Sequence, residues 1–325
     1  MARAAPRVVD SFAVSLPASA RRPTDVDLSV RIGPLLLSNP VIAASGTFGY
    51  GVEFAHLVDL NSLGGIVVKG LSAQPLAGAP APRLCETAGG MLNAVGLQNI
   101  GVRAFVAEKL PELRKYRTAV VANVFGHTVA EYVEVIRVLE DAEGLAAYEL
   151  NISCPNVDHG GAEFGLDPAL TTEVVTAARH AAKRPLWVKL APNADVKAIA
   201  RAAESAGADA LTVANTYPAM SIDPLTGRSR LGRRTGGLSG PAIKPLTLRL
   251  VYDLSRAVRL PIIGLGGIKT AGDAVEYMMA GAAAIQIGTA HFADPRASES
   301  VVEGLRHHCK ELSLYTINDL RRPIE

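Results

Sequence analysis

The chain has 325 residues, 49% hydrophobic and 20% charged, so it is long enough for two ordinary domains or one large α/β barrel. Its net charge of +2, with scattered basic residues, argues against a nucleic-acid-binding protein. Three widely spaced cysteines without a C-x-x-C pair argue against a disulfide framework and a metal site, and they fit the reducing cytoplasm. No stretch approaches the roughly 18 consecutive apolar residues of a transmembrane helix.

Residues 1–25 are predicted to be an N-terminal extension that precedes the folded domain. They are rich in alanine, arginine and proline, and Asp10 interrupts them before any continuous apolar segment begins. This composition is not typical of a signal peptide, and chain ends that are not tied into a core are commonly flexible. We therefore expect a single domain over residues 26–325.

Eight short runs rich in β-branched residues alternate with alanine-rich stretches of helical period. Strands are predicted over residues 40–44, 65–69, 119–124, 147–151, 186–190, 210–214, 261–264 and 284–287. Helices are predicted over residues 102–115, 129–141, 168–182, 195–206, 241–257 and 271–280, with N-terminal caps at Asp195 and Thr270 and C-terminal caps at Gly207 and Gly281. This alternation predicts a (β/α)8 TIM barrel.

Two intervals between the predicted elements are too long for simple connections. Residues 70–101 and 215–240 are rich in glycine, proline and polar residues, and each follows a predicted strand. Both should therefore project as long loops from the C-terminal face of the barrel, where they are candidates for lids or substrate walls.

Polar residues and glycines follow all eight predicted strands, at the face where barrel enzymes place their active sites. Asparagine and glycine are ordinary turn residues, so their presence at any one strand end can be explained without a role in binding. Lys69 and Lys189 are different, because a lysine at the end of an apolar strand needs a partner for its ammonium group. A large anionic or electron-rich ligand would supply that partner.

Cys154 follows the fourth predicted strand. A free cysteine is most often an inert buried residue. Here, however, the neighbouring residues Asn151, Ser153, Pro155 and Asn156 cannot form an apolar pocket, and the amides and the hydroxyl can hydrogen-bond a ligand. This polar setting favours a chemical role for the thiol.

The last two strands are followed by glycine-rich loops, Gly264-Leu-Gly266-Gly267 and Gly288-Thr289. In TIM barrels the loops after strands 7 and 8 often bind phosphate, because glycine lets backbone N–H groups approach the oxygens closely. The spacing is not that of a Rossmann fingerprint, so FMN is favoured over a dinucleotide. Two other readings stay open: a flavin-free aldolase or isomerase with a Schiff base on Lys69 or Lys189, and a non-catalytic ligand-binding scaffold.

Several runs together resemble a known family, the class 1 dihydroorotate dehydrogenases. They are Asn39-Pro-Val-Ile-Ala-Ala-Ser45-Gly-Thr, Met91-Leu-Asn93-Ala-Val-Gly96-Leu97, Asn151-Ile-Ser-Cys154-Pro-Asn156, Asn215-Thr216, Gly236-Gly-Leu-Ser-Gly240-Pro-Ala-Ile-Lys244-Pro and Gly266-Gly267-Ile268. Class 2 has serine at the position of Cys154. The second and fifth runs most resemble class 1B, the NAD-linked catalytic subunit, and the likeness covers about residues 26–295.

The resemblance implies oxidation of (S)-dihydroorotate to orotate in pyrimidine biosynthesis, with Cys154 as the general base opposite FMN. The implied substrate-binding residues are Lys69, Asn93, Ala94, Val95, Gly96, Leu97, Asn151, Asn156, Asn215 and Thr216. The implied FMN-binding residues are Ser45, Lys69, Gly70, Asn123, Asn151, Lys189, Ala214, Gly240, Gly266, Gly267, Gly288 and Thr289.

The class 1B resemblance also implies a partner subunit that carries FAD and an iron–sulfur cluster and passes electrons to NAD. The expected assembly is a homodimer, or a heterotetramer with that subunit. A class 1A enzyme that uses fumarate is the nearest alternative. The sequence departs from the family pattern at Tyr217-Pro-Ala-Met220 and in the basic stretch Arg228–Arg234, so the conformation of that loop is not implied.

Overall fold

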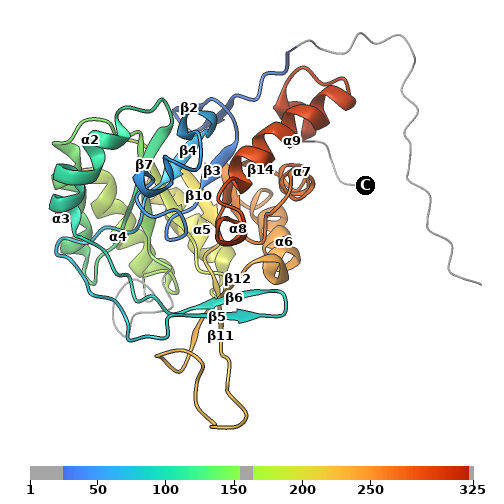
Figure 1. Ribbon diagram of the computed structural model, residues 1–325. Helices are drawn as coiled ribbons and strands as arrows, with labels where there is room; N and C mark the ends of the chain where they lie inside the picture. The colour runs from blue at the N-terminus through green and yellow to red at the C-terminus, as the bar shows by residue number, and fades with distance from the viewer. Residues whose placement is uncertain (1–24, 154–163, 322–325) are drawn as a thin grey trace, which may run out of the picture.

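The computed structural model describes residues 25–153 and 164–321, and its centre is a closed barrel of eight parallel strands (Figure 1). The strands follow one another around the barrel in chain order. They are β3 (Val41–Ala43), β4 (Gly65–Val67), β7 (Ala119–Val124), β8 (Ala147–Asn151), β9 (Leu186–Lys189), β10 (Ala210–Val213), β13 (Ile262–Leu265) and β14 (Ala282–Ile287). Each predicted strand overlaps one of these, which confirms the predicted (β/α)8 TIM barrel.

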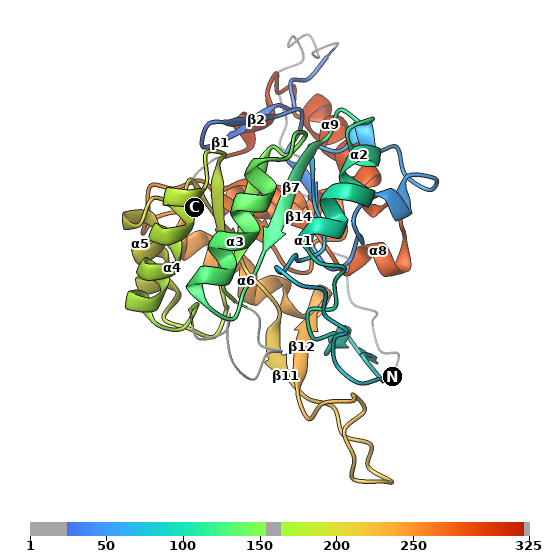
Figure 2. The ribbon, with the colours of Figure 1, turned by 90° about the vertical axis from the view of Figure 1, so that its left-hand side faces the viewer.

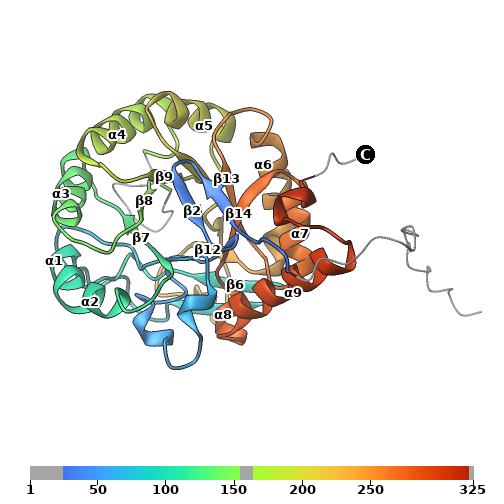
Figure 3. The ribbon, with the colours of Figure 1, turned by 90° about the horizontal axis from the view of Figure 1, so that it is seen from above.

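Helices surround the barrel on its outside, as the view along the barrel axis shows (Figure 3). They are α1 (Val102–Ala104), α2 (Leu110–Leu113), α3 (Val129–Glu140), α4 (Pro168–Ala181), α5 (Val196–Ser205), α6 (Lys244–Leu254), α7 (Ala271–Met279), α8 (Ala290–Ala293) and α9 (Ala297–Glu311). Short 3-10 helices are η1 (Val52–Phe54), η2 (Leu60–Ser62), η4 (Pro241–Ile243) and η5 (Ile317–Leu320). Each long helix buries one apolar face against the strands, as Val135 and Ile136 do on α3.

The predicted helix caps are confirmed, but one predicted helix is interrupted. The Asp195 side chain accepts a hydrogen bond at the start of α5, and Thr270 forms a capping box at the start of α7. Gly207 and Gly281 follow these helices with positive φ angles. Within the predicted helix 102–115, the π-helical segment η3 (Phe105–Lys109) separates α1 from α2. Pro111 explains the change, because proline has no N–H for an α-helical hydrogen bond.

A hairpin that was not predicted covers one end of the barrel (Figure 3). Strands β1 (Val30–Ile32) and β2 (Leu35–Leu37) pair antiparallel, and Gly33 turns between them with a φ of 57°. The buried side chains of Val30, Ile32 and Leu37 join the main core. Residues 1–24 lie outside the described part of the chain, so the N-terminal extension stays a prediction.

The two intervals predicted as loops instead build a second sheet. Strands β5 (Leu84–Thr87) and β6 (Gly90–Asn93) come from the first interval, and β11 (Tyr217–Ala219) and β12 (Gly236–Ser239) come from the second. They pair in the order β11-β12-β6-β5, at the opposite end of the molecule from the β1–β2 hairpin (Figure 2). The segment between β11 and β12 projects beyond the rest of the chain (Figure 2). Among the described helices, none is long and apolar enough to cross a membrane.

Candidate active site

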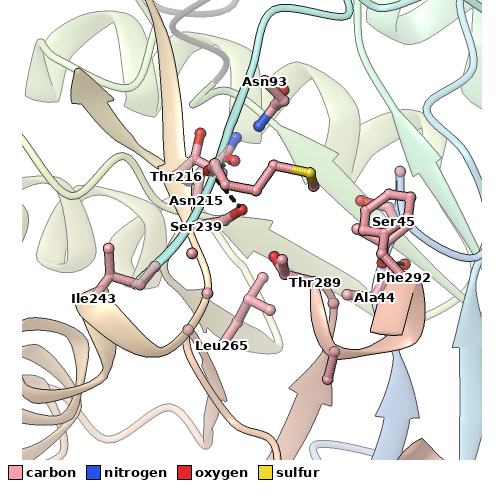
Figure 4. Close-up of a pocket in the computed structure, with 18 of the residues that line it drawn as sticks. Ala44, Ser45, Asn93, Asn215, Thr216, Ser239, Ile243, Leu265, Thr289 and Phe292 are labelled. Atoms are coloured by element: carbon pink, nitrogen blue, oxygen red, sulfur yellow. Dashed lines mark hydrogen bonds between the residues drawn. The ribbon is translucent and has the colours of Figure 1, made fainter. Parts of the chain in front are cut away.

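A cavity of about 470 Å³ lies between the carboxyl ends of the barrel strands and the second sheet (Figure 4). Residues that end or follow all eight barrel strands line it, from Ser45 after β3 to Thr289 after β14. Its volume falls within the range of about 300–1,000 Å³ that is typical of small-molecule sites. The cavity therefore lies at the C-terminal face of the barrel, where the sequence predicted the active site.

The cavity brings together most of the residues that the sequence singled out. Those that line it are Ser45, Lys69, Gly70, Asn93, Val95, Gly96, Leu97, Asn123, Asn151, Lys189, Ala214, Asn215, Thr216, Gly240, Gly266, Gly267, Gly288 and Thr289. Ala94 does not line it, because its methyl group packs in a small apolar cluster with Leu92 and Leu231 behind the wall. Cys154 and Asn156 lie outside the described residues.

The glycine loop after β13 is held in close contact with the start of η4 and α6. Gly266 and Gly267 have φ angles of 153° and 68°. A Cβ atom on Gly266 would stand 2.7 Å from Thr247 Oγ1, and one on Gly267 would stand 2.9 Å from the Gly240 oxygen. Only glycine fits either position, so a ligand can approach the backbone here without meeting a side chain.

Amide side chains cluster on another side of the cavity, where Figure 4 shows Asn93, Asn215 and Thr216 away from Leu265 and Thr289. Asn215 Nδ2 donates to Ser153 Oγ over 3.1 Å and to the Ser153 carbonyl oxygen over 3.2 Å. Ser153 Oγ in turn donates to Asn151 Oδ1 over 3.3 Å. These bonds tie the end of β8 to the end of β10, directly before Cys154 in the chain.

The ionisable residues that line the cavity carry an excess of positive charge. They are Lys69, Lys189 and Lys269, with Glu86 as the acidic residue among the described lining positions. Lys189 is almost fully buried and donates a hydrogen bond to Ser45 Oγ over 3.3 Å. Such a cavity favours an anionic ligand. The described residues contain no group of three or more side chains that could hold a metal ion.

Lys244, which belongs to one of the motifs, faces away from the cavity. Its ammonium group lies 2.6 Å from Asp273 Oδ1 and 2.8 Å from Glu276 Oε1, and these bonds raise the pKa of Lys244. Burial raises the pKa of Asp273, but the hydrogen bonds from Lys244, Lys269 and Thr270 outweigh burial and lower it. This cluster ties α6 to α7 and so supports the glycine loop between them.

Sequence reasoning missed several residues of the site. Phe292 of α8 lines the cavity, and that helix was not predicted. Met91 and Ser239 also line it, and Ser239 Oγ donates to the Met91 oxygen over 3.3 Å (Figure 4). Glu149 lies beneath the cavity, fully buried in β8. A carboxylate inside an apolar run needs buried partners, and this signal was present in the sequence.

Comparisons with known proteins agree on one family. A family model described as dihydroorotate dehydrogenase matches residues 27–309. A protein of Solibacter usitatus, provisionally named dihydroorotate dehydrogenase A (fumarate), is 58% identical over 90% of this chain and 97% of its own length. A dihydroorotate dehydrogenase B (NAD(+)) catalytic subunit of Geotalea uraniireducens is 50% identical over 90% and 97%. The crystal structure of the Eimeria tenella enzyme, at 23% identity, superposes with a TM-score of 0.76 over 94% of this chain and 90% of that one.

Proposed function

The chain belongs to the dihydroorotate dehydrogenase family, and on that basis we propose that its cavity oxidises (S)-dihydroorotate to orotate with FMN as cofactor. The proposal rests on one observation: the glycine loops after β13 and β14 line the same cavity as the amides and lysines at the ends of β4 to β10. A phosphorylated planar cofactor and a small carboxylated ring need these two kinds of wall together. The reaction is a step of pyrimidine biosynthesis.

The residues present fit FMN. Gly266, Gly267, Gly288 and Thr289 would hold its phosphate through backbone N–H groups and one hydroxyl. Asn123 Oδ1 is buried and has no hydrogen-bond partner among the described residues, so it would accept a hydrogen bond from a ring N–H group of FMN. Lys189 supplies a positive charge beside the same wall. FMN, when bound, accepts the hydride from C6 of the substrate.

The amides on the other wall suit dihydroorotate. Asn93, Asn151 and Asn215 line the cavity, and each side chain carries an amide N–H₂ group and an amide oxygen. The substrate ring likewise carries both N–H groups and carbonyl oxygens. Asn215 is oriented by its bonds to Ser153, so its direction is fixed before substrate binds. Lys69 would pair with the substrate carboxylate.

Cys154 would remove the proton from C5. A thiol has an ordinary pKa of about 8.5, which neighbouring cations and donors lower toward neutral pH. The cations that line the cavity would provide this effect, and the bonds between Asn215, Ser153 and Asn151 would hold the chain that leads into Cys154. The thiolate would act as a general base, not as a covalent nucleophile.

For the electron acceptor, we propose NAD, reached through a partner subunit that carries FAD and an iron–sulfur cluster. Several relatives at about half identity are named as the NAD-linked catalytic subunit, whereas the relative at 58% identity is named for fumarate. The resemblance of the motifs to class 1B favours NAD as the acceptor. The corresponding assembly is a homodimer of this chain, alone or in a heterotetramer with the partner.

Two measurements test the proposal. The purified chain should contain FMN, and anaerobic dihydroorotate should bleach its flavin spectrum. Reoxidation by NAD only when the co-expressed partner is present supports the class 1B assignment, whereas direct reoxidation by fumarate contradicts it.

A substitution then tests the base. Cys154→Ser should reduce the rate of flavin bleaching at least about 100-fold at neutral pH and retain FMN. A colourless chain that is trapped by borohydride together with a substrate would instead support the Schiff-base reading.

A further inference from the structure

A buried carboxylate lies at the centre of the barrel, beneath the cavity. Glu149 on β8 is fully buried and does not line the cavity. Its oxygens accept hydrogen bonds from Asn123 Nδ2 over 2.8 Å, from Thr212 Oγ1 over 2.8 Å and from Gln286 Nε2 over 2.6 Å. These partners come from β7, β10 and β14, on different sides of the barrel. Three donors converging on one side chain suit the charged carboxylate form.

The same carboxylate lies beside the most deeply buried cation of the cavity. Lys189 Nζ stands 3.9 Å from Glu149 Oε1, and the side chains are 6% and 0% exposed. At such burial each charge depends on the other, because removing one partner leaves an uncompensated charge in a low dielectric. Glu149 therefore offsets the charge that Lys189 presents to the cavity.

Glu149 also decides which way the Asn123 amide faces. A carboxylate only accepts hydrogen bonds, so the amide nitrogen must point toward Glu149. The amide oxygen is then directed toward Gly70, where a Cβ atom would stand 2.9 Å from Asn123 Oδ1. Both Gly70 and Asn123 line the cavity. Glu149 thereby makes this wall a hydrogen-bond acceptor.

We propose that Glu149 is a positioning residue that orients Asn123 and Lys189 toward the bound flavin and lowers the reduction potential of that flavin. The inference rests on the FMN site of the proposed function. The positive charge of Lys189 stabilises the anionic reduced flavin, and the negative charge of Glu149 offsets part of that effect. Removing the carboxylate while keeping Lys189 leaves the site more positive and raises the potential.

The test compares Glu149→Gln with a matched control, Thr212→Val. Both variants alter the same buried hydrogen-bond cluster, but only the first removes a charge, and Thr212 does not line the cavity. The quantity to compare is the ratio of the affinity for reduced FMN to the affinity for oxidised FMN. In Glu149→Gln we expect this ratio to be about tenfold higher than in the unchanged protein, which corresponds to a rise of about 30 mV in the two-electron potential. Thr212→Val should lower the melting temperature and leave the potential as in the unchanged protein.

A Glu149→Gln protein that binds FMN with an unchanged or lowered potential would overturn the proposal, because a purely structural carboxylate would lower only the melting temperature. If that variant does not hold FMN, Lys189→Met is compared with the double variant Lys189→Met/Glu149→Gln, because the two proteins differ only in the carboxylate. The double variant should have the higher potential, and an equal or lower value contradicts the proposal. An unchanged parent chain that binds no FMN refutes the proposed function itself, which separates the two failures.

Discussion

The two ends of the barrel use polar side chains in opposite ways. At the amino end of the strands, the guanidinium group of Arg184 donates to the Leu139, Ala142 and Leu145 carbonyl oxygens and to the Tyr148 hydroxyl. It also pairs with Glu140 at 3.0 Å. At the carboxyl end, Asn123 Oδ1 and Gln286 Oε1 are buried and have no hydrogen-bond partner among the described residues.

This difference separates a structural end from a binding end. The guanidinium group of Arg184 has its partners within the chain, so we expect Arg184 to contribute to stability. At the other end, the Asn123 and Gln286 amide nitrogens donate to Glu149, and Asn123, which lines the cavity, keeps its oxygen available to accept from a ligand. Substitutions at the amino end should therefore lower stability and spare activity, and substitutions at the cavity should do the reverse.

The largest effect should come from Asn215→Ala. The amide lines the cavity and is oriented by Ser153, so its loss should lower kcat/KM for dihydroorotate by about 100- to 1,000-fold, because substrate polar groups lose a prearranged partner. Steady-state kinetics and thermal melting of the two proteins measure this. Asn318→Ala, at the amino end, is the control and should leave kcat/KM unchanged. Equal losses in both variants would contradict the division between the ends.

Arg184→Met should have the next largest effect, on stability alone. The substitution removes the guanidinium donors to the part-buried Ala142 and Leu145 carbonyl oxygens and the ion pair to Glu140, so we expect a loss of about 2–3 kcal/mol in the free energy of unfolding. Urea denaturation of the FMN-free protein measures it, with kcat/KM as the second readout. A fall in kcat/KM at full FMN occupancy would show that the amino end does affect the chemistry.

The barrel and its functional face were predictable from sequence for physical reasons. Buried parallel strands are nearly continuous apolar runs, and their carboxyl ends meet at one face, so the polar residues after them had to converge. The second sheet was missed because β6 and β12 contain glycines and show no alternation of apolar and polar residues. In these strands packing decides the conformation more than propensity does.

The directions of side chains were less predictable than the positions of strands. Ala94 belongs to a motif of the cavity wall, but its methyl group faces Leu92 and Leu231 behind that wall. Glu149 lies within the strand predicted over residues 147–151, directly before the Cys154 motif, and no role was predicted for it. The reasoning applied to Lys69 and Lys189, that a charge in an apolar run needs a partner, applies to Glu149 equally.

A smaller effect should distinguish the carboxyl end by its response to acid. His291 of α8 is buried against Phe48, and burial lowers the pKa of His291 from 6.5 to about 4. Between these values the unfolded chain binds the proton more tightly than the folded one. The contribution of neutral His291 to the free energy of unfolding is therefore complete above about pH 6.5 and is lost as the pH falls toward 4.

Stability should fall by up to about 1.4 kcal/mol per pH unit within that window through this residue. Chemical denaturation at a series of pH values measures it, and His291→Gln should show a flatter dependence between pH 6.5 and pH 4 than the unchanged protein does. Identical slopes in the two proteins would mean that His291 takes up its proton as readily when folded.

The smallest effect compares two helix caps, one near each end of the barrel. Thr270 caps α7 directly after the Gly266-Gly267 loop. Thr316 caps η5 near the start of the described chain, where it forms a β-bridge with Asp27. Each of the two threonines forms a capping box, so Thr270→Val and Thr316→Val should each lower the free energy of unfolding by about 1 kcal/mol. Only Thr270→Val should also weaken FMN binding, by about two- to threefold, because the start of α7 helps to fix the Gly266-Gly267 loop that we propose holds the FMN phosphate. Titration of the FMN-free proteins with FMN separates the two outcomes, and equal affinities would place the phosphate contacts away from the β13–α7 loop.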